Sequence, residues 1–205
     1  LLESAAKRFA LELSISRRVP LLSNAFAKLV MQVLELTVGN DVRQFKHLIN
    51  STYLGLEPSQ REEAETALRD SFKKKQLQWV ALKEWTDEKA AFSWMAQVLE
   101  WRMKALGSVA SAGEWLNRLR DLVDILLDPF GGGPTAERDS RAQSALLKAV
   151  YQAASIDSHR YDATSVGQFV DLCRRVWKAA DVSVPASSRG IEVCSDGEAL
   201  GDLEC

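Results

Sequence analysis

Two strand-like stretches near opposite ends of the chain constrain its fold more than any other feature. Residues 11–16 alternate apolar and polar side chains, the period of two that gives a strand one buried face. Residues 191–194 form a second, β-branched stretch that runs into a turn bounded by two glycines. Because two strands alone are marginally stable in water, we expect them to pair with each other or with further strands. The chain would then leave a sheet, build a separate body and return.

The residues between these strands are patterned as helices. Phe26, Leu29, Val30, Val33 and Leu34 recur at i, i+3, i+4, i+7 and i+8, and Gly39 is placed to end that helix. Similar stripes predict a short helix over residues 1–10 and helices that begin near residues 41, 59, 86, 111, 140 and 164. The helix over 92–106 has an apolar arc wide enough to contact neighbours on two sides. The predicted fold class is therefore mainly α, with two short terminal strands.

Helix starts are marked by residues whose side chains can accept a hydrogen bond from the first turn. Two stretches fit the Ser-x-x-Glu capping box, one at Ser59 and one at Ser111. The other predicted caps are Ser23 or Asn24, Asp41, Thr86, and Thr164 or Ser165. Residues 17–20 are interpreted as a turn, residues 73–75 as a basic helix end, and residues 128–135, with two prolines and three consecutive glycines, as a loop.

Bulk composition excludes several classes of protein. The net charge of −2 and the pI of about 5.8 do not fit a generally basic nucleic-acid-binding surface, although they allow a local basic patch. No apolar run approaches the roughly 20 residues that span a bilayer, and no secretory signal is visible. Three cysteines without metal-ligand spacing fit a reducing compartment. We therefore expect a cytoplasmic location without membrane partners, and the abrupt end at Cys205 suggests a piece of a longer protein.

Short motifs that could indicate catalysis lack the context they need. The glycine triplet at residues 131–133 has no Lys-Ser/Thr after it and no strand before it, so it predicts a flexible connection and not a phosphate loop. Asp87-Glu88-Lys89 spells the D/E-x-K of metal-dependent nucleases. However, it is expected at a helix start, where acidic residues are favoured by the dipole alone.

Histidines and cysteines show no partners at useful spacing either. His47 and His159 have no companion ligand, and Cys173 and Cys194 have no nearby histidine that could activate a thiol. The six tryptophans could stack on bases, but their helical spacing favours burial for most. No catalytic, cofactor-binding or metal-ligating residue is predicted, and an enzyme in its own right is the least supported hypothesis.

Basic residues form four local clusters that could contact DNA phosphates. The alternative is that each cluster is simply a solvated helix end or face. The candidate DNA-binding residues are Arg17, Arg18, Lys73, Lys74, Lys75, Arg118, Arg120, Arg174 and Arg175.

Four stretches of the chain resemble a known family. Residues 11–36 (beginning Leu-Glu-Leu-Ser-Ile-Ser-Arg-Arg-Val-Pro-Leu), 45–56 (with Leu-Ile-Asn-Ser-Thr-Tyr-Leu-Gly), 111–115 and 190–201 are similar to segments of UvrD-type superfamily 1 helicases and their AddB-like relatives. Active helicases carry a His and a Lys-Gly-Leu-Glu phrase in the turn that matches residues 195–201. Here Asp196 and Glu198-Ala199-Leu200-Gly201 stand instead, which favours the AddB or RecC kind, whose helicase fold serves as a scaffold.

The resemblance implies a domain plan and a set of partners. Residues 1–22 would be an edge of the helicase-like 2A domain, 23–188 an inserted helical 2B-like domain, and 189–205 the return to 2A, with hinges at 19–20 and 185–188. ATP and a divalent metal are implied for the parent complex, whose ATPase and nuclease motifs would lie elsewhere. The expected partners are double-stranded or unwinding DNA and a partner helicase-nuclease subunit.

Two function hypotheses remain open at this point. The first is a non-catalytic helical domain of a DNA repair and recombination helicase-nuclease subunit, which contacts DNA or the partner motor subunit. The second is a stand-alone helical protein–protein interaction module, in which the wide apolar helix over 92–106 docks a partner. A large exposed apolar patch on that helix would support the second hypothesis.

Overall fold

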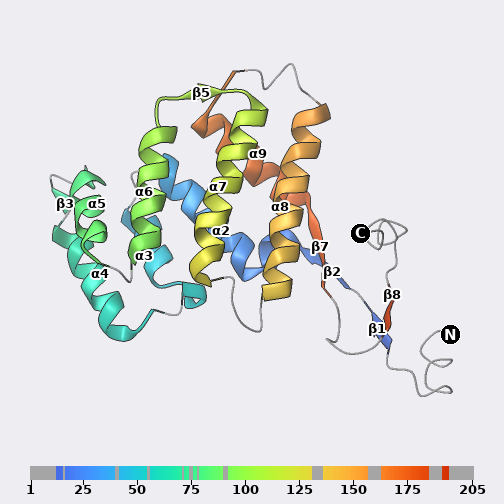
Figure 1. Cartoon of the computed structure of the whole chain (residues 1–205), viewed down its shortest axis with the longest axis horizontal. Coiled ribbons are helices and arrows are strands. Elements are labelled where there is room, and N and C mark those ends of the chain that lie inside the picture. Colours follow the sequence, from blue (N-terminus) through green and yellow to red (C-terminus); the bar gives the residue numbers. More distant parts are fainter. Residues whose placement is uncertain are drawn as a thin grey trace.

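The protein is mainly helical, as its periodicity predicts (Figure 1). The computed structural model describes residues 13–15, 17–39, 42–54, 56–70, 72–73, 76–77, 79–89, 92–130, 136–156, 163–184 and 191–193. Its α-helices are α2 (Ala25–Val38), α3 (Val42–Ile49), α4 (Pro58–Asp70), α5 (Trp79–Asp87), α6 (Ser93–Ala105), α7 (Ala112–Phe130), α8 (Ala136–Ile156) and α9 (Val166–Ala179). Two 3-10 turns, η1 (Leu21–Ser23) and η2 (Thr52–Leu54), precede and follow the first two helices.

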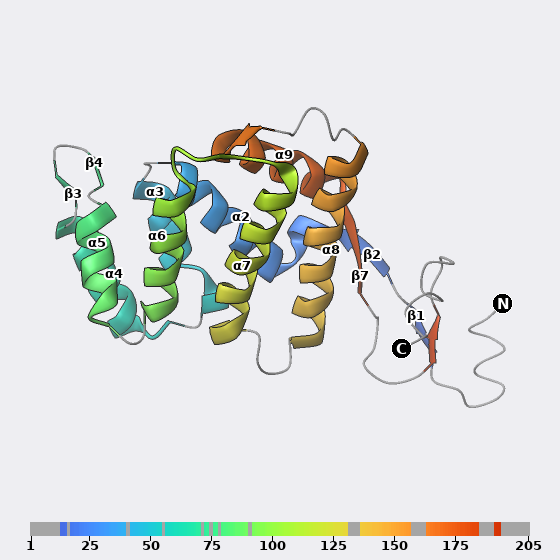
Figure 2. The ribbon, with the colours of Figure 1, turned by 45° about the horizontal axis from the view of Figure 1, so that its top comes forward.

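Helix α2 lies at the centre of the helical body. Asn24 begins it, with a side-chain oxygen that accepts a hydrogen bond from the Ala27 N–H at 3.1 Å, and Gly39 ends it, both as predicted. Its apolar residues are buried on nearly all sides, because it packs against α3, α6, α8 and α9. Helices α6, α7 and α8 stand side by side across it, while α4 and α5 extend the body at one end (Figures 1 and 2).

Four pairs of short strands accompany the helices in the described chain. Strand β1 (Leu13–Ile15) pairs in parallel with β8 (Ile191–Val193), with Leu13 opposite Ile191 and Ile15 opposite Val193. The two strand predictions near the termini, and their expected pairing, are therefore confirmed. This pair lies beyond the far end of the helical body from α4 and α5 (Figure 1).

A second strand pair corrects the interpretation of residues 17–20 as a turn. Strand β2 (Arg17–Pro20) runs antiparallel to β7 (Asp181–Val184), and the Leu21 N–H continues the ladder by donating to the Ala180 carbonyl at 2.8 Å. Val182 is buried in the helical core, so this pair belongs to the helical body. Residues 19–20, where a hinge was predicted, are paired with residues 181–182 in this ladder. The signal was missed because a two-arginine strand shows no apolar alternation, and its partner lies more than 160 positions away.

One of the two predicted capping boxes forms, as does the predicted cap at Ser165, whereas the predicted caps at Ser59 and Thr86 are wrong. At α7, the Glu114 N–H donates to Ser111 Oγ at 3.3 Å, and the Ser111 N–H donates to the Glu114 carboxylate at 2.8 Å. These bonds to Ser111 lower the pKa of Glu114. Ser165 caps α9 in the same way with Gln168.

Ser59 and Thr86 do not begin helices. Helix α4 already starts at Pro58, and the Gln60 side chain accepts from the Glu57 N–H, so the cap lies two residues earlier than predicted. Thr86 lies in the last turn of α5, where its hydroxyl donates to the Lys83 carbonyl. A hydroxyl bonded back into its own helix is an alternative that the sequence pattern alone does not distinguish from a cap.

The predicted ends of three helices also shift. Helix α4 stops at Asp70, and β3 (Phe72–Lys73) pairs with β4 (Gln76–Leu77) where a basic helix end was predicted. Two apolar residues, Phe72 and Leu77, are opposite each other in this register, a cross-strand pairing that competes with the helical pattern. Helix α7 extends through Pro129 to Phe130, and α8 starts at residue 136 instead of 140. Residues 131–135 of the predicted loop, and the predicted helix over 1–10, lie outside the described residues.

Two short strands pair with each other just before the N-terminal ends of α7 and α9. Gly107, with φ of 75°, ends α6 as predicted, and β5 (Val109–Ala110) then pairs with β6 (Thr164–Ser165). Trp115 is fully buried beneath this pair. Its indole N–H donates to the Thr164 carbonyl at 2.7 Å, and its ring stacks on Phe169 with centroids 5.3 Å apart. The expected burial of most tryptophans is confirmed, because those at 94, 101, 115 and 177 all belong to the core.

Candidate nucleic-acid interface

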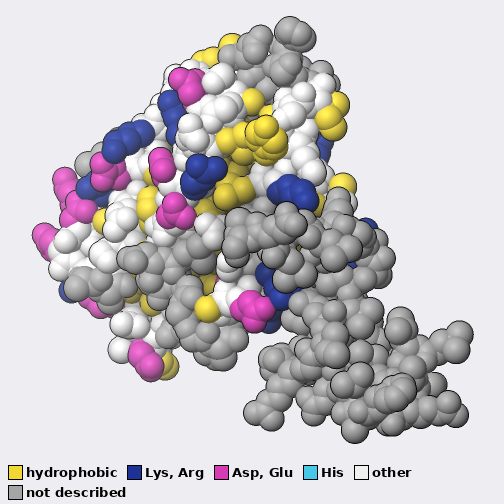
Figure 3. All heavy atoms as spheres, turned by 45° about the vertical axis from the view of Figure 1, so that its right-hand side comes forward, with side chains coloured by type: hydrophobic (Ala, Val, Ile, Leu, Met, Phe, Trp, Pro, Cys, Tyr) yellow, Lys and Arg dark blue, Asp and Glu magenta, His cyan; other side chains and the backbone are white. Residues whose placement is uncertain are grey.

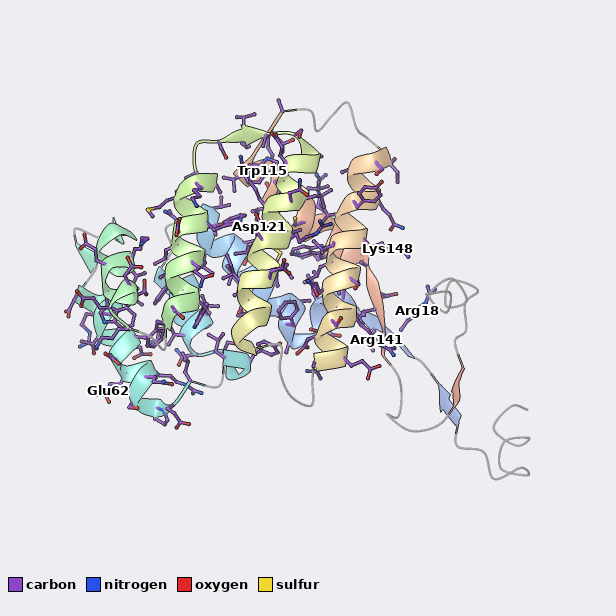
Figure 4. All side chains as sticks on the ribbon, in the orientation of Figure 1. Arg18, Glu62, Trp115, Asp121, Arg141 and Lys148 are labelled. Carbon is purple, nitrogen blue, oxygen red and sulfur yellow. The ribbon has the colours of Figure 1, made fainter. Side chains whose placement is uncertain are left out.

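The basic residues singled out from the sequence do not form one surface. Lys73 lies on β3, at the α4–α5 end of the molecule, whereas Arg18 lies on β2 near the opposite end (Figures 1 and 4). Arg118 and Arg120 are on α7, and Arg174 and Arg175 are on α9. Nothing is described of the side chains at positions 17 and 73, and Lys74 and Lys75 lie outside the described residues. The cluster that contains Lys73 and the cluster that contains Arg18 are therefore separated by the length of the helical body.

Arg118 has a structural contact that orients it toward the protein. Its Nη1 donates to Ser108 Oγ at 2.7 Å, and its guanidinium lies 4.7 Å from the centroid of the Trp115 ring. A planar cation over an indole face is stabilised by the ring quadrupole. Arg118 thus fixes the α6–α7 connection and is a poor candidate for a DNA contact.

Arg174 is held in a similar way by two carboxylates. Its Nε lies 3.1 Å from Glu35 of α2, and its Nη1 lies 2.5 Å from Asp171 one turn earlier. The side chain is 37% exposed, and the ion pair ties α9 to α2. Of the predicted cations with described side chains, this leaves Arg18, Arg120 and Arg175 exposed.

Two further cations on α8 lie on the same side of the molecule as Arg18. Arg141 and Lys148 are seven residues apart, hence on one helix face and about 10 Å apart along the axis. Figure 4 places both, with Arg18, along the edge that borders β2 and β7. We call Arg18, Arg141 and Lys148 the basic edge. The sequence reasoning looked for adjacent basic residues, but a search at helical spacing would have found the α8 pair.

The charges on the basic edge differ in how they are compensated. Arg141 Nη2 lies 2.8 Å from the Glu137 carboxylate, one turn earlier on α8. Lys148 is exposed and forms no ion pair within the part of the chain that the structure describes. Arg18 and Lys148 therefore lie at this edge as exposed cations in a chain whose net charge is −2.

A shallow groove runs between α8 and α9 beside the basic edge. Most of its lining is apolar and includes three alanines, and its polar members are a glutamine and an arginine. The lining residues are Ala149, Gln152, Leu172, Arg175, Val176, Ala179 and Ala180. Figure 3 views the molecule from this side and shows hydrophobic side chains gathered between Lys and Arg side chains.

The nuclease-like sequence Asp87-Glu88-Lys89 has no catalytic geometry. Asp87 ends α5 and forms an ion pair with Lys83 at 2.6 Å, while Lys89 pairs with Glu63 of α4 at 2.7 Å. The prediction that it begins a helix is wrong, although the interpretation of its charges as structural agrees with these pairs. Among the described residues, no three His, Cys, Asp or Glu side chains lie close enough to hold a metal ion.

The described thiol and imidazole are equally unsuited to catalysis. Cys173 is fully buried in the core, and this burial raises the pKa of its thiol. A nucleophilic cysteine needs the opposite shift and access to solvent. His47 is exposed on α3, and the predicted loop that holds His159 lies outside the described residues, as does Cys194.

A buried carboxylate is the most unusual polar group in the described structure. Asp139 of α8 is completely buried, and its Oδ2 accepts a hydrogen bond from the Tyr53 hydroxyl at 2.6 Å. Burial, followed by this hydrogen bond to Asp139, raises the pKa of Tyr53. Asp139 Oδ1 has no hydrogen-bond partner among the described residues and lies 3.8 Å from Arg138 Nε. The pair joins η2 to α8 and is a structural link between distant parts of the chain.

Helix α6 does not offer the apolar docking surface that the second hypothesis requires. Its wide arc is buried on two sides, as predicted, with Trp94, Val98 and Trp101 in the core. Its large exposed apolar side chains are Met103 at 42% and, at its C-terminal cap, Leu106 at 40%. A helix so enclosed by its own chain cannot dock a partner through that arc.

Comparison with models of protein families and with curated proteins found no match to this chain. Within the described residues, no helix is both long enough and apolar enough to cross a membrane.

Proposed function

We propose that this chain is a non-catalytic helical domain of a DNA-processing helicase-nuclease subunit of the AddB or RecC kind. In this proposal the β1–β8 pair belongs to the sheet of a neighbouring helicase-like domain, and the helical body is inserted between the two strands. The body contacts DNA phosphates, or the partner motor subunit, while ATP hydrolysis takes place elsewhere in the complex.

The observation that carries the proposal is the parallel pairing of β1 with β8. Parallel strands occur almost always in sheets that are covered on both faces, and a pair with three residues in each strand is too small to be stable alone. Leu13 and Ile15 are paired with Ile191 and Val193, and the polar pair of Ser14 and Glu192 lies between them, so the apolar residues of both strands share one face of the pair. Such a pair is best explained as part of a larger sheet, from which the helices project.

The basic edge supports contact with a phosphate backbone. Arg18, Arg141 and Lys148 come from two elements that meet beside β7, close to the strands that would lead into the larger domain. Contacts of this kind position a duplex without reading its sequence. With a net charge of −2, we expect weak binding that depends strongly on salt.

A salt titration with a short labelled DNA duplex tests the proposal. Three phosphate contacts give a slope of log K against log salt of about −2.7, at about −0.9 for each contact. The double variant Arg18→Glu, Lys148→Glu should bring the slope to about −0.9. Lys104→Glu on α6 makes the same charge change as each one of these two substitutions, at an exposed site away from the basic edge, and should leave the slope unchanged. Binding without salt dependence, or equal loss in the control, would contradict phosphate contact at this edge.

A further inference from the structure

We propose that the groove between α8 and α9 binds an acidic amphipathic helix of a protein partner. This inference does not rest on the DNA proposal, because it arises from the shape and chemistry of the groove itself. A phosphate backbone needs cations and polar groups, whereas this groove has an apolar floor and places its cations at the border.

The floor suits the close approach of another helix. Ala149 on α8 and Ala179 on α9 line it together with Val176, and small side chains allow a partner's backbone to come near. The outer side chains of a partner helix would then fill the space that the alanines leave. Such helix-in-groove binding places apolar residues of the partner at i, i+3, i+4 and i+7.

A stripe of three apolar residues and one glutamine on α8 extends beyond both ends of the groove lining. Ala145, Ala149, Gln152 and Ile156 are spaced at i, i+4, i+7 and i+11, so they follow one face of the helix for about 16 Å. Ile156 is 88% exposed at the end of the stripe. An isoleucine so open to water, in line with an apolar groove, is the kind of side chain that a partner covers.

The cations beside the groove favour a partner of negative charge. Arg175 lines the groove on α9, Lys148 precedes the lining residue Ala149 on α8, and both cations are exposed. The Arg175 Nε donates to the Asp171 main-chain carbonyl at 3.4 Å, and neither cation forms an ion pair with a described carboxylate. Carboxylates along both edges of a docked helix would face these two cations, which favours an acidic partner over a basic one.

A designed peptide tests the inference directly with the full chain. The probe is a fluorescein-labelled peptide of about 18 residues, or five turns, with leucine at the helical positions i, i+3, i+4 and i+7 and glutamate on the flanks. Its binding is followed by fluorescence anisotropy. Two control peptides are needed: one of the same composition with the apolar period broken, and one with lysine in place of glutamate. We expect the acidic amphipathic peptide to bind and both controls to bind at least about tenfold more weakly.

Variants of the chain locate the binding in the groove. Arg175→Glu and Ala179→Glu each place a carboxylate beside the docked glutamates and should weaken binding about fivefold. Ala179→Gln fills the same space as Ala179→Glu without the charge, so the difference in affinity between these two variants measures the effect of the charge alone. Arg120→Glu on α7 should bind as the wild type. All four positions are exposed or at the groove surface, and circular dichroism confirms that each variant is folded.

Three outcomes would overturn the inference. Equal binding of the period-broken peptide would show that no helix face is recognised. Unchanged affinity in Arg175→Glu and Ala179→Glu would place the peptide elsewhere. Loss of duplex DNA binding in these two variants, with no binding of the acidic peptide to the wild type, would make the groove part of a nucleic-acid surface.

Discussion

The hydrogen bond between Tyr53 and Asp139 should contribute strongly to stability, and Tyr53→Phe is the substitution that measures it. The Asp139 carboxylate is fully buried and accepts from the Tyr53 hydroxyl at 2.6 Å. A phenylalanine keeps the ring, which packs 6.0 Å from Phe26 between centroids, and removes only the donor. The carboxylate would then keep its ion pair with Arg138, at 3.8 Å between Oδ1 and the guanidinium Nε.

The expected magnitude follows from this geometry. A hydrogen bond to a charged group contributes about 1.5–3 kcal/mol, and a buried charge that loses its donor lies at the upper end of that range. We therefore expect Tyr53→Phe to lower the free energy of unfolding by about 3 kcal/mol. For a chain of this size the melting temperature should fall by about 6–12 °C.

A double-mutant cycle separates this bond from other effects of the substitution. Asp139→Asn keeps the shape and an acceptor oxygen but removes the charge, so Tyr53→Phe in that background should cost about 1 kcal/mol. Urea denaturation followed by tryptophan fluorescence gives all four free energies. A coupling energy below about 0.5 kcal/mol would refute the claim that the hydroxyl stabilises a buried charge.

Three further predictions concern single groups. Ser165→Ala removes the α9 capping box and should cost about 1 kcal/mol in urea denaturation, whereas Ser155→Ala, at an exposed site within α8, should cost far less; equal losses would mean that the cap is not the cause. The pKa of Tyr53 is raised above its ordinary 10.0. The stability that its protonated hydroxyl contributes is therefore fully present below pH 10.0 and is lost as the pH rises above that value. In urea titrations at strongly alkaline pH, the difference in free energy of unfolding between the wild type and Tyr53→Phe should therefore shrink. A difference that grows with pH would contradict this prediction. Burial raises the pKa of the Cys173 thiol, so mass spectrometry should find the Cys173 peptide unmodified after iodoacetamide treatment of the native protein and modified after denaturation; rapid native labelling would contradict its burial.

The helices were predictable because each carries its own evidence. In α2, apolar residues recur at helical spacing between Asn24, whose side chain accepts from the first turn, and Gly39, which ends it. The Ser111 box needs only residues within one turn of each other. Signals confined to three or four positions act before any tertiary contact forms, so they can be read from the order of residues.

The candidate site was predictable only in part. Arg18 and Arg175 are exposed as a DNA-contact prediction requires, but Arg118 and Arg174 are held by structural partners. Nothing near Arg174 in sequence indicates Glu35, which lies 139 positions away and meets it because α2 and α9 pack together. Whether a cation faces solvent or a carboxylate is therefore decided by packing, not by its neighbours along the chain.

Local patterns alone determined that this chain is mainly helical, with short strands near both ends, because helical and extended periodicity each depend on neighbours a few residues apart. Only the tertiary structure decided that β2 joins β7, that Asp139 is buried against Tyr53, and that α8 and α9 enclose a groove. Each of these features joins residues from distant parts of the chain. Their free energy comes from burial and pairing across that separation, which no window of sequence contains.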